Sequence, residues 1–421
     1  METINFSEKI NYQPILNLGF LGSVSDGKST AVYQLTGTKT QKHSSELKRN
    51  ITIKPGYANM KIFKDFDNNY YSTNSSKSTY ENPDGEECEL VHHLSFVDCP
   101  GHHQLILTML GSIDLMQGAI VVVSAAESID MKPQLIQHLA AAKLAKLDNI
   151  IICLNKLDLI PIKLARKRKE ELDMLLERLE IEPKAIIPTS FSKGIGVNNL
   201  LRTIMEFFSP SDIMSHETVQ FRTTRSFDVN KPGTSWDKIT GGILGGSLIT
   251  GKLKVGDMLE IRPGIIGKDP KGKVICTPLK TKLLSIQTDR EKVDDILPGG
   301  LMGLGTDIDP YYCRNDTLAG NIVGIEGSLP SVYTNIEMSY TPTTDFGGEW
   351  KPKVGSIVNL QIGTLSIDSR LMKYKKSLCS FDLSRPVCIN INSLVLISVK
   401  ESSGLKIVGF GHLKGGKVLH D

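Results

Sequence analysis

The sequence lacks any long hydrophobic run. Its longest mostly apolar stretch, Ala119–Ala126, is far shorter than the roughly 18 residues that a membrane-spanning helix needs. The first ten residues, METINFSEKI, contain no apolar core of a secretion signal. We therefore expect neither an integral membrane protein nor a secreted one.

Cysteine is scarce and scattered. None of the seven cysteines belongs to a CxxC pair, so the sequence indicates neither a disulfide framework nor a zinc knuckle. A reducing, cytoplasmic location is the simplest expectation. The seven are Cys88, Cys99, Cys153, Cys276, Cys313, Cys379 and Cys388.

A large excess of charge of either sign is also absent. The chain has 49 Lys and Arg against 46 Asp and Glu, a net charge of +3, so no global basic field attracts nucleic acid. A bound polyanion must be held by a local patch or by one of its ends. With 421 residues and 40% hydrophobic composition, the chain can form several buried cores, and we expect two to four domains.

The first half of the chain alternates short apolar runs with helical stretches. This pattern is typical of a parallel sheet with helices on both faces. The basic residues within 163–169 are followed at once by Glu170 and Glu171, so we interpret them as a solvated helix face rather than a nucleic-acid patch. The expected strands are 15–21, 94–98, 119–124, 150–154 and 185–188, and the expected helices are 29–36, 132–145, 162–179 and 197–208.

Beyond FFSPS at 207–211 the helical period disappears, and short β-rich runs alternate with Gly and Pro. This texture indicates antiparallel barrels or sandwiches. We expect an α/β domain over residues 1–210 and two all-β domains over 211–329 and 330–421. The polar stretch 67–87 is expected to be a surface insertion or mobile loop.

The segment GSVSDGKS at 22–29 fits the pattern G-x-x-x-x-G-K-[ST]. It follows an apolar strand and opens a helix, the context that favours a phosphate loop over a chance Gly-rich turn. Its glycines let backbone N–H groups wrap phosphates, while Lys28 supplies a positive charge and Ser29 a hydroxyl for Mg²⁺. The loop alone does not distinguish ATP from GTP.

The segment NKLD at 155–158 follows the strand IIICL and indicates the base. A carboxylate at Asp158 can accept hydrogen bonds from both N1–H and the 2-amino group of guanine. Adenine lacks that arrangement of donors and would leave the carboxylate unpaired. The motif is weak alone, but its place after a strand and downstream of a phosphate loop makes it specific for GTP.

Two further segments are candidates for the phosphate side of the site. In DCPGH at 98–102, Asp98 can hold Mg²⁺ through water and the N–H of Gly101 can contact the γ-phosphate, although a plain strand-ending turn with a surface histidine is the alternative. Thr52, in RNITI, can complete the Mg²⁺ shell when the γ-phosphate is present. Taken alone it would be an ordinary strand threonine.

The sequence Ser190-Phe191-Ser192 is the candidate for a backbone contact to guanine O6. The motif is short, and a simple strand-to-helix loop explains its spacing nearly as well.

These motifs, in this order, resemble those of the translational GTPases, above all the gamma subunit of translation initiation factor 2 of eukaryotes and archaea. The resemblance covers nearly the whole chain and thins after residue 331. Elongation factor Tu shares the architecture but has RGITI where this chain has RNITI. The segments that carry the resemblance are GSVSDGKST, ELKRNITIKPGYANMKI, FVDCPGHHQLILTML, ESIDMKPQLIQHLAAAKLAKLDNIIICLNKLDL, RSFDVNKPG, ITGGILGGSLITGKLKVGDMLEIRPG and LPGGLMGLGTDIDP.

The resemblance implies an α/β P-loop GTPase domain followed by two β-barrels. It also implies a GTPase that uses GTP, GDP and Mg²⁺ to carry initiator methionyl-tRNA to the small ribosomal subunit. The implied partners are alpha and beta subunits and factors for GTPase activation and nucleotide exchange. By the same resemblance His102 orients the attacking water, and Asn50 and Tyr57 are candidates for the tRNA acceptor end. The implied nucleotide and Mg²⁺ contacts are Gly22, Ser23, Val24, Ser25, Asp26, Gly27, Lys28, Ser29, Thr30, Thr52, Asp98, Gly101, Asn155, Lys156, Asp158, Ser190, Phe191 and Ser192.

The chain departs from the family pattern at several positions. Cys88 is the one cysteine between the two switch segments, where the family often has a zinc knuckle, so we expect no zinc. At position 103 this chain has His where the family usually has an acidic residue. Phe191 stands where the family usually has alanine, and Asp26 where it usually has histidine.

Three alternatives stay open at this point. A specialised elongation-type GTPase for selenocysteinyl-tRNA would be expected to carry a fourth, C-terminal domain, and this chain ends too early for it. A GTP-binding structural subunit without significant turnover would not need Lys28, Thr52, Asp98 and His102 together. A P-loop ATPase or kinase is disfavoured by NKLD.

Overall fold

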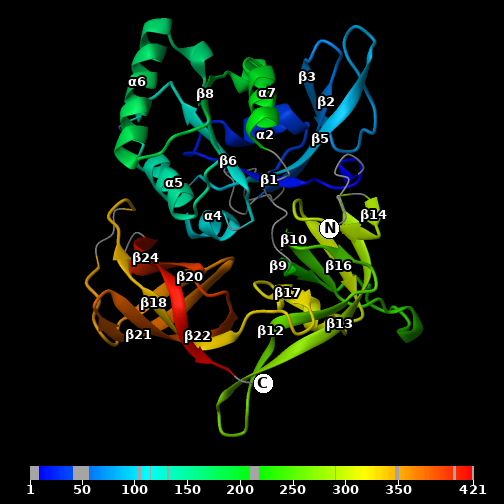
Figure 1. Ribbon diagram of the computed structural model, residues 1–421, viewed down its shortest axis with the longest axis vertical. Coiled ribbons are helices and arrows are strands. Elements are labelled where there is room, and N and C mark those ends of the chain that lie inside the picture. Colours follow the sequence, from blue (N-terminus) through cyan, green and yellow to red (C-terminus); the bar gives the residue numbers. More distant parts are fainter. Residues whose placement is uncertain are drawn as a thin grey trace. The chain divides into compact units, whose positions relative to one another are not determined.

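The computed structural model describes residues 9–40, 56–101, 106–113, 115–129, 132–208, 218–289, 291–346, 350–401 and 404–419. The chain forms two compact units, Met1–Asp212 and Ile213–Asp421. The first contains a mostly parallel sheet with helices, and the second contains two β-barrels (Figure 1). The predicted fold class, an α/β domain followed by two all-β barrels, is confirmed.

The sheet of the first unit has the strand order β3-β2-β5-β1-β6-β7-β8, and β4 pairs with β5. Strand β1 (Leu16–Leu21) is parallel to β5 (Glu87–Asp98) and to β6 (Gly118–Ser124). Every residue of β1, β6 and β7 is buried, because helices cover both faces, and this explains their continuous apolar sequences. The remaining strands are β2 (Gly56–Lys64), β3 (Tyr70–Asn74), β4 (Tyr80–Glu81), β7 (Ile150–Asn155) and β8 (Ala185–Pro188).

Helices lie on both sides of this sheet, with α4, α5 and α6 on one side and α2 and α7 on the other (Figure 1). The basic stretch of α6 is mostly a solvated face, as predicted, since Lys163, Arg166 and Lys167 are exposed. Arg168 is the exception, because it is largely buried in an ion pair with Glu171. The bounds are α2 (Lys28–Thr36), α4 (Ile106–Ile113), α5 (Pro133–Leu144), α6 (Ile162–Leu179) and α7 (Val197–Phe207), with short 3₁₀ turns η3 (Leu157–Leu159) and η4 (Phe191–Lys193).

Residues 67–87 are expected to form a surface insertion or a mobile loop, and the mobile loop is wrong. This stretch contains β3 and β4, and β3 pairs antiparallel with β2 over Lys64↔Tyr70 to Met60↔Asn74. Asp65 holds the connection between these two strands, because its carboxylate accepts hydrogen bonds from the Asn69 backbone N–H at 2.8 Å and the Tyr71 hydroxyl at 3.0 Å. Strand pairing and the hydrogen bonds of the buried Asp65 carboxylate therefore order this segment, although its polar composition predicts a loop.

Each barrel of the second unit closes six strands into a ring. In the first barrel the order β12-β17-β9-β10-β16-β13 is closed by pairing of β12 with β13, and β14 is added at β13. The strands are β9 (Gln220–Phe227), β10 (Ile243–Thr250), β12 (Met258–Lys268), β13 (Val274–Thr288), β14 (Glu291–Val293), β16 (Met302–Thr306) and β17 (Ile322–Ile325). A two-stranded sheet of β11 (Leu253–Lys254) and β15 (Asp295–Ile296) and the turns η6 (Trp236–Lys238) and η7 (Pro310–Asp316) complete it.

The second barrel has the order β18-β22-β21-β20-β23-β24 and is closed by β18 with β24. Its inward side chains form one apolar core that includes Leu360, Phe381 and Ile397. The strands are β18 (Val332–Ser339), β19 (Thr341–Pro342), β20 (Ile357–Ile362), β21 (Leu365–Lys375), β22 (Leu378–Cys388), β23 (Leu394–Glu401) and β24 (Gly404–Val418).

The two barrels share a small apolar cluster of Ile322, Leu329, Val332 and Cys388. They belong to one compact unit, so the division of the chain into three domains at residues 210 and 329 stays a prediction.

Two adjacent histidines of β5 are buried. His92 Nε2–H donates to the Phe208 carbonyl at 3.3 Å, and His93 Nδ1–H donates to the Ile10 carbonyl at 3.0 Å. Burial lowers the pKa of His92 to about 4 and that of His93 to about 3. Both imidazoles are therefore neutral at pH 7.

We predict that the free energy of unfolding falls as the pH drops below 6.5. In the unfolded chain both histidines are protonated with the ordinary pKa of 6.5. In the folded chain His92 is protonated only near pH 4 and His93 only near pH 3. Each histidine should therefore lower the free energy of unfolding by about 1.4 kcal/mol between pH 7.5 and pH 5.5. Urea unfolding of the full chain at both pH values measures this, and a His92→Gln/His93→Gln variant should lose correspondingly less. Equal losses in parent and variant would contradict the assignment.

Candidate functional site

The carboxyl ends of parallel strands bring the predicted motifs to one edge of the sheet. Phe20 of β1 is paired with Asp98 of β5, and Ser124 of β6 is paired with Asn155 of β7. The phosphate loop follows β1, NKLD begins at the end of β7, and the Ser190 loop follows β8. Loops outside the carboxyl ends of such strands are where α/β sheets bind ligands.

The phosphate loop has a backbone shape that requires glycine at two positions. Gly22 has φ 136° and Gly27 φ 104°, both in the region that L side chains rarely adopt. A Cβ at Gly22 would lie 2.2 Å from the Val122 carbonyl oxygen, and one at Gly27 would lie 2.5 Å from Asn155 Nδ2. The motif glycines therefore allow the loop to pass closely over the ends of β6 and β7.

The ammonium group of Lys28 lies inside this loop and is hydrogen-bonded to its backbone. It donates to the carbonyl oxygens of Gly22 and Ser23, each at 2.8 Å. Burial lowers the pKa of Lys28, and the nearby carboxylates of Asp98 and Asp26 oppose that shift. The loop thus holds its cation in place through its own carbonyl groups.

Gly101 lies against the phosphate loop. A Cβ on Gly101 would be 2.5 Å from Lys28 Nζ and 2.9 Å from the Gly22 carbonyl oxygen. The turn after β5 therefore brings its backbone to the same point as Lys28. The contact of the Gly101 N–H with the γ-phosphate stays a prediction.

Oxygen atoms converge on the carboxylate of Asp98, which is fully buried. Ser29 Oγ donates to Asp98 Oδ2 at 2.7 Å, and Thr40 Oγ1 donates to the same oxygen at 2.6 Å. Hydroxyl and carboxylate oxygens are the ligands that Mg²⁺ prefers, so these residues fit the ion. Thr40 was missed by sequence reasoning, because a single threonine in TGTKT has no distinguishing pattern.

Asn155 connects the phosphate side of the site to the base side. Its Nδ2 donates to the Asp26 carbonyl at 2.9 Å, and its Oδ1 accepts from the Phe191 N–H at 3.1 Å. Phe191 is fully buried, and its N–H is used by Asn155. The backbone of the loop 190–192 as a whole is the predicted contact to guanine O6. That contact stays a prediction.

Asp158 is held by the loop after β8. Its Oδ1 accepts a 2.7 Å hydrogen bond from Ser190 Oγ, and this bond lowers the pKa of the Asp158 carboxyl. Lys193 Nζ lies 3.6 Å from the other carboxylate oxygen. Asp158 is therefore an ionised acceptor at neutral pH, as recognition of guanine requires.

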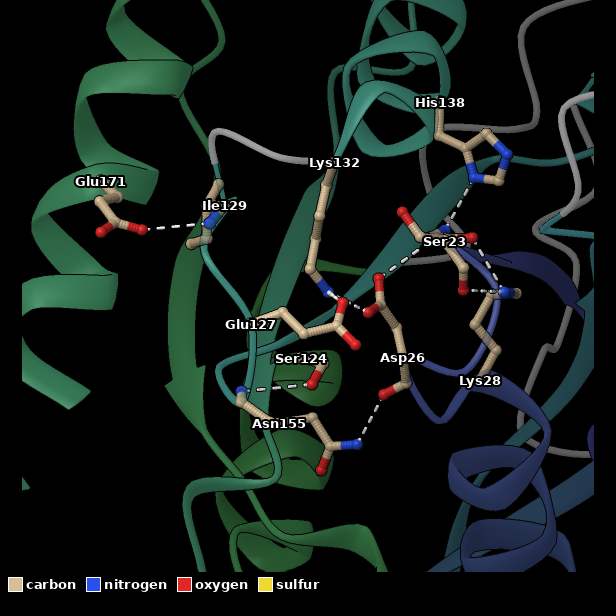
Figure 2. A network of polar contacts seen from close by, with 12 residues as sticks. Ser23, Asp26, Lys28, Ser124, Glu127, Ile129, Lys132, His138, Asn155 and Glu171 are labelled. Atoms are coloured by element: carbon tan, nitrogen blue, oxygen red, sulfur yellow. Dashed lines mark hydrogen bonds and ion pairs between the residues drawn. The ribbon is translucent and has the colours of Figure 1, made fainter. Parts of the chain in front are cut away.

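Two residues of the segment before and within α5 also contact the phosphate loop (Figure 2). Lys132 forms an ion pair with Asp26, and His138 Nδ1 accepts a hydrogen bond from the Gly22 N–H at 2.9 Å. Burial lowers the pKa of His138 to about 3, so the ring is neutral and carries its proton on Nε2. Neither residue carries a recognisable sequence signal, because each lies over 100 positions from its partner.

The other predicted site residues differ in how far they are exposed to solvent. Val24 and Lys156 are half-buried, whereas Ser25, Thr30 and Ser192 are exposed. Tyr57 lies in β2, half-buried and paired with Val97. Asn50, Thr52, His102 and His103 lie outside the described residues.

The described segments hold no group of three or more His, Cys, Asp or Glu side chains that could bind a metal ion. None of the helices in this same part of the chain is long and apolar enough to cross a membrane.

Comparison with known proteins supports the sequence resemblance. Residues 13–210 match the Elongation factor Tu GTP binding domain, and residues 343–413 match the family described as Initiation factor eIF2 gamma, C terminal. The chain is 36% identical to "Eukaryotic translation initiation factor 2 subunit gamma" of Encephalitozoon cuniculi, covering 97% of this chain and 94% of that protein. It is also 36% identical to "Eukaryotic translation initiation factor 2 subunit 3" of Drosophila melanogaster, covering 98% and 91%.

Solved structures share the fold at lower sequence identity. A bacterial selenocysteine-specific elongation factor matches with a TM-score of 0.69 and 21% identity, covering 95% of this chain and 58% of that chain. Elongation factor SelB of Methanococcus maripaludis, in complex with a GTP analogue, matches with a TM-score of 0.68 and 19% identity, covering 96% and 80%. These similarities concern the fold alone.

The relatives of 36% identity extend over nearly the full length of this chain. GTPases of this kind bind GTP and GDP, typically with Mg²⁺. The chain belongs to the gamma-subunit family of translation initiation factor 2 and is a GTPase with an elongation factor Tu-type GTP-binding domain.

Proposed function

We propose that this chain, in its GTP form, carries initiator methionyl-tRNA to the small ribosomal subunit and releases it after GTP hydrolysis. The observation that supports this most is identity of 35–36% over nearly the whole chain to proteins named as the gamma subunit or subunit 3 of initiation factor 2. The proposed partners are the alpha and beta subunits of the factor and the proteins that activate hydrolysis and exchange nucleotide. The proposed location is the cytoplasm.

The phosphates of GTP are proposed to bind the loop 22–29, with further contacts from Thr30 and Gly101. Close packing of Gly101 against Lys28 supports this, since both would then face the same phosphate oxygens. Mg²⁺ would be held by Ser29, by Thr52 and through water by Asp98, and would neutralise charge on the phosphates. Hydroxyl donation by Ser29 to Asp98 supports the proposed set.

The guanine base is proposed to bind between NKLD and the Ser190 loop. Asp158 would accept from N1–H and the 2-amino group, while Asn155, Lys156 and the backbone of residues 190–192 shape the pocket. The Asn155 hydrogen bonds to both loops support this, because they fix the base side relative to the phosphate side.

Hydrolysis is proposed to release the segments around Thr52 and Gly101 by removing the γ-phosphate that holds them. Asn50 and Tyr57, on or next to the first of these segments, are proposed to contact the acceptor end of the tRNA. Tyr57 offers a ring face on which an unpaired terminal base can stack.

The function is tested by filter binding of charged tRNAs to the full chain. We expect charged initiator tRNA to bind at least about tenfold more tightly with GTP than with GDP, the size of a typical coupling between ligands. Charged elongator methionine tRNA is the control and should bind much more weakly. Equal binding of the two tRNAs would contradict an initiation role and favour an elongation-type carrier, and binding of neither would leave a GTPase that carries no tRNA.

We predict that Asp158→Asn changes the base preference from guanine to xanthine. Xanthine has a carbonyl where guanine has its 2-amino group, and the Asn amide can donate where the carboxylate only accepts. GTP affinity should fall on the order of tenfold to a hundredfold, as expected for loss of a charged hydrogen bond, while XTP affinity rises. Competition binding with both nucleotides measures this, and Asp173→Asn on the exposed face of α6 is the matched control. Unchanged GTP affinity would remove Asp158 from the base site.

We predict that His102→Ala binds GTP and charged tRNA nearly as the parent does but hydrolyses GTP more slowly. The imidazole would act on the attacking water or on charge that develops in the transition state, and ground-state GTP does not need it. Stimulated hydrolysis should fall at least about tenfold in single-turnover assays with ribosomal subunits and the activating factor. His103→Ala is the built-in control and should cost much less. A larger loss in His103→Ala would show that the wrong histidine has been assigned.

A further inference from the structure

The phosphate loop contains a buried carboxylate. Asp26 is 1% exposed and is fixed at three points. Its Oδ2 accepts from the Ser23 N–H at 2.9 Å, its Oδ1 contacts Lys132 Nζ, and its backbone carbonyl accepts from Asn155 at 2.9 Å (Figure 2). Asp26 therefore braces the loop from within.

Lys132 is the cation that faces this carboxylate. It lies at the residue before helix α5, and its side chain is 4% exposed. A second carboxylate, Glu127, lies 3.7 Å from Lys132 Nζ, but that side chain is 74% exposed. Asp26 is thus the principal buried partner of Lys132.

A negative charge at this position conflicts with the ligand. The loop is built to bind phosphates, and a carboxylate within it repels them unless a cation balances its charge. Lys28 cannot serve both purposes, because its own charge is needed at the phosphates. Lys132 supplies a separate positive charge from a different segment of the chain, 106 positions away.

We infer that Lys132 is a positioning residue for nucleotide binding, which acts through Asp26 by neutralising it while Asp26 braces the loop. The inference rests on the proposed binding of guanine nucleotide phosphates to residues 22–29. It predicts an asymmetry between the two partners. Removal of the cation leaves an unbalanced negative charge beside the phosphates, whereas removal of the anion leaves an unbalanced positive one.

The alternative is that the pair merely anchors the connection between β6 and α5. The chain offers a matched control, because a second buried ion pair holds the same connection from the other side. Arg168 pairs with Glu171, and Glu171 Oε2 accepts from the Ile129 N–H at 3.1 Å and from Ser128 Oγ at 3.2 Å. This control pair holds the connection without placing a charge in the phosphate loop.

The experiment measures the dissociation constants of fluorescent GDP and GTP analogues and the melting temperature of the nucleotide-free full chain. We expect Lys132→Met to weaken binding of both nucleotides at least about tenfold, the scale of a lost partner in a buried charge pair. Asp26→Asn should bind at least tenfold more tightly than Lys132→Met, although both variants break the same ion pair. The double variant Asp26→Asn/Lys132→Met should recover most of the loss, and Lys132→Arg should retain most of the parent affinity.

Arg168→Met should lower the melting temperature yet leave nucleotide affinity within about threefold of the parent, because it changes no charge at the phosphates. The inference is overturned if Lys132→Met binds as the parent does, if Arg168→Met weakens binding as much as Lys132→Met, or if the double variant is no better than Lys132→Met. If Lys132→Met does not fold, the double variant is compared with the parent instead, and binding more than about tenfold weaker than that of the parent overturns the inference. A parent chain that binds no guanine nucleotide would instead refute the proposed function.

Discussion

The arrangement of the site depends on one constraint, the parallel pairing of β1 with both β5 and β6. Parallel strands end at the same edge of a sheet, so the loops after β1, β5, β7 and β8 emerge close together although they lie far apart in sequence. The glycines at positions 22, 27 and 101 allow these loops to approach one another within contact distance. Asn155 then joins two of them directly, because it is hydrogen-bonded both to Asp26 of the phosphate loop and to Phe191 of the loop after β8.

Charge balance at the phosphate loop is the second constraint. Lys28, Lys132, Asp26 and Asp98 are all nearly or fully buried within this small region. Buried charges are tolerated only when they are paired and hydrogen-bonded, and here each carboxylate accepts hydrogen bonds from neighbouring groups. The neutral ring of His138 accepts a hydrogen bond from the Gly22 N–H and adds no charge to the loop. We infer that Lys132 compensates the charge of Asp26, so that the phosphate loop can accept an anionic ligand.

Sequence reasoning identified the elements whose pattern is local. The strands of β1, β6 and β7 and the helix of α6 were predicted within one or two residues, because their apolar runs and helical period are continuous. It was wrong in offering a mobile loop over residues 67–87, because β3 pairs with β2 and β4 pairs with β5 in this stretch. It also missed Thr40, Lys132 and His138, since their roles come only from contacts with distant residues. The predicted roles of Asn50, Thr52 and His102 concern residues outside the described ranges.

The sequence by itself determined the kind of chemistry. A glycine-bounded loop with Lys28 and Ser29 after a buried strand, followed downstream by Asp98 and by NKLD, predicts a guanine nucleotide site because these motifs carry their groups within a few consecutive residues. Only the tertiary structure decided how that site is stabilised. The Asp26–Lys132 pair, the Asn155 bridge and the close packing of Gly101 on Lys28 each join segments that are 36 or more positions apart. Contacts between distant segments produce no periodicity and no motif in a single sequence. They depend on the order of the strands in the sheet rather than on neighbouring residues.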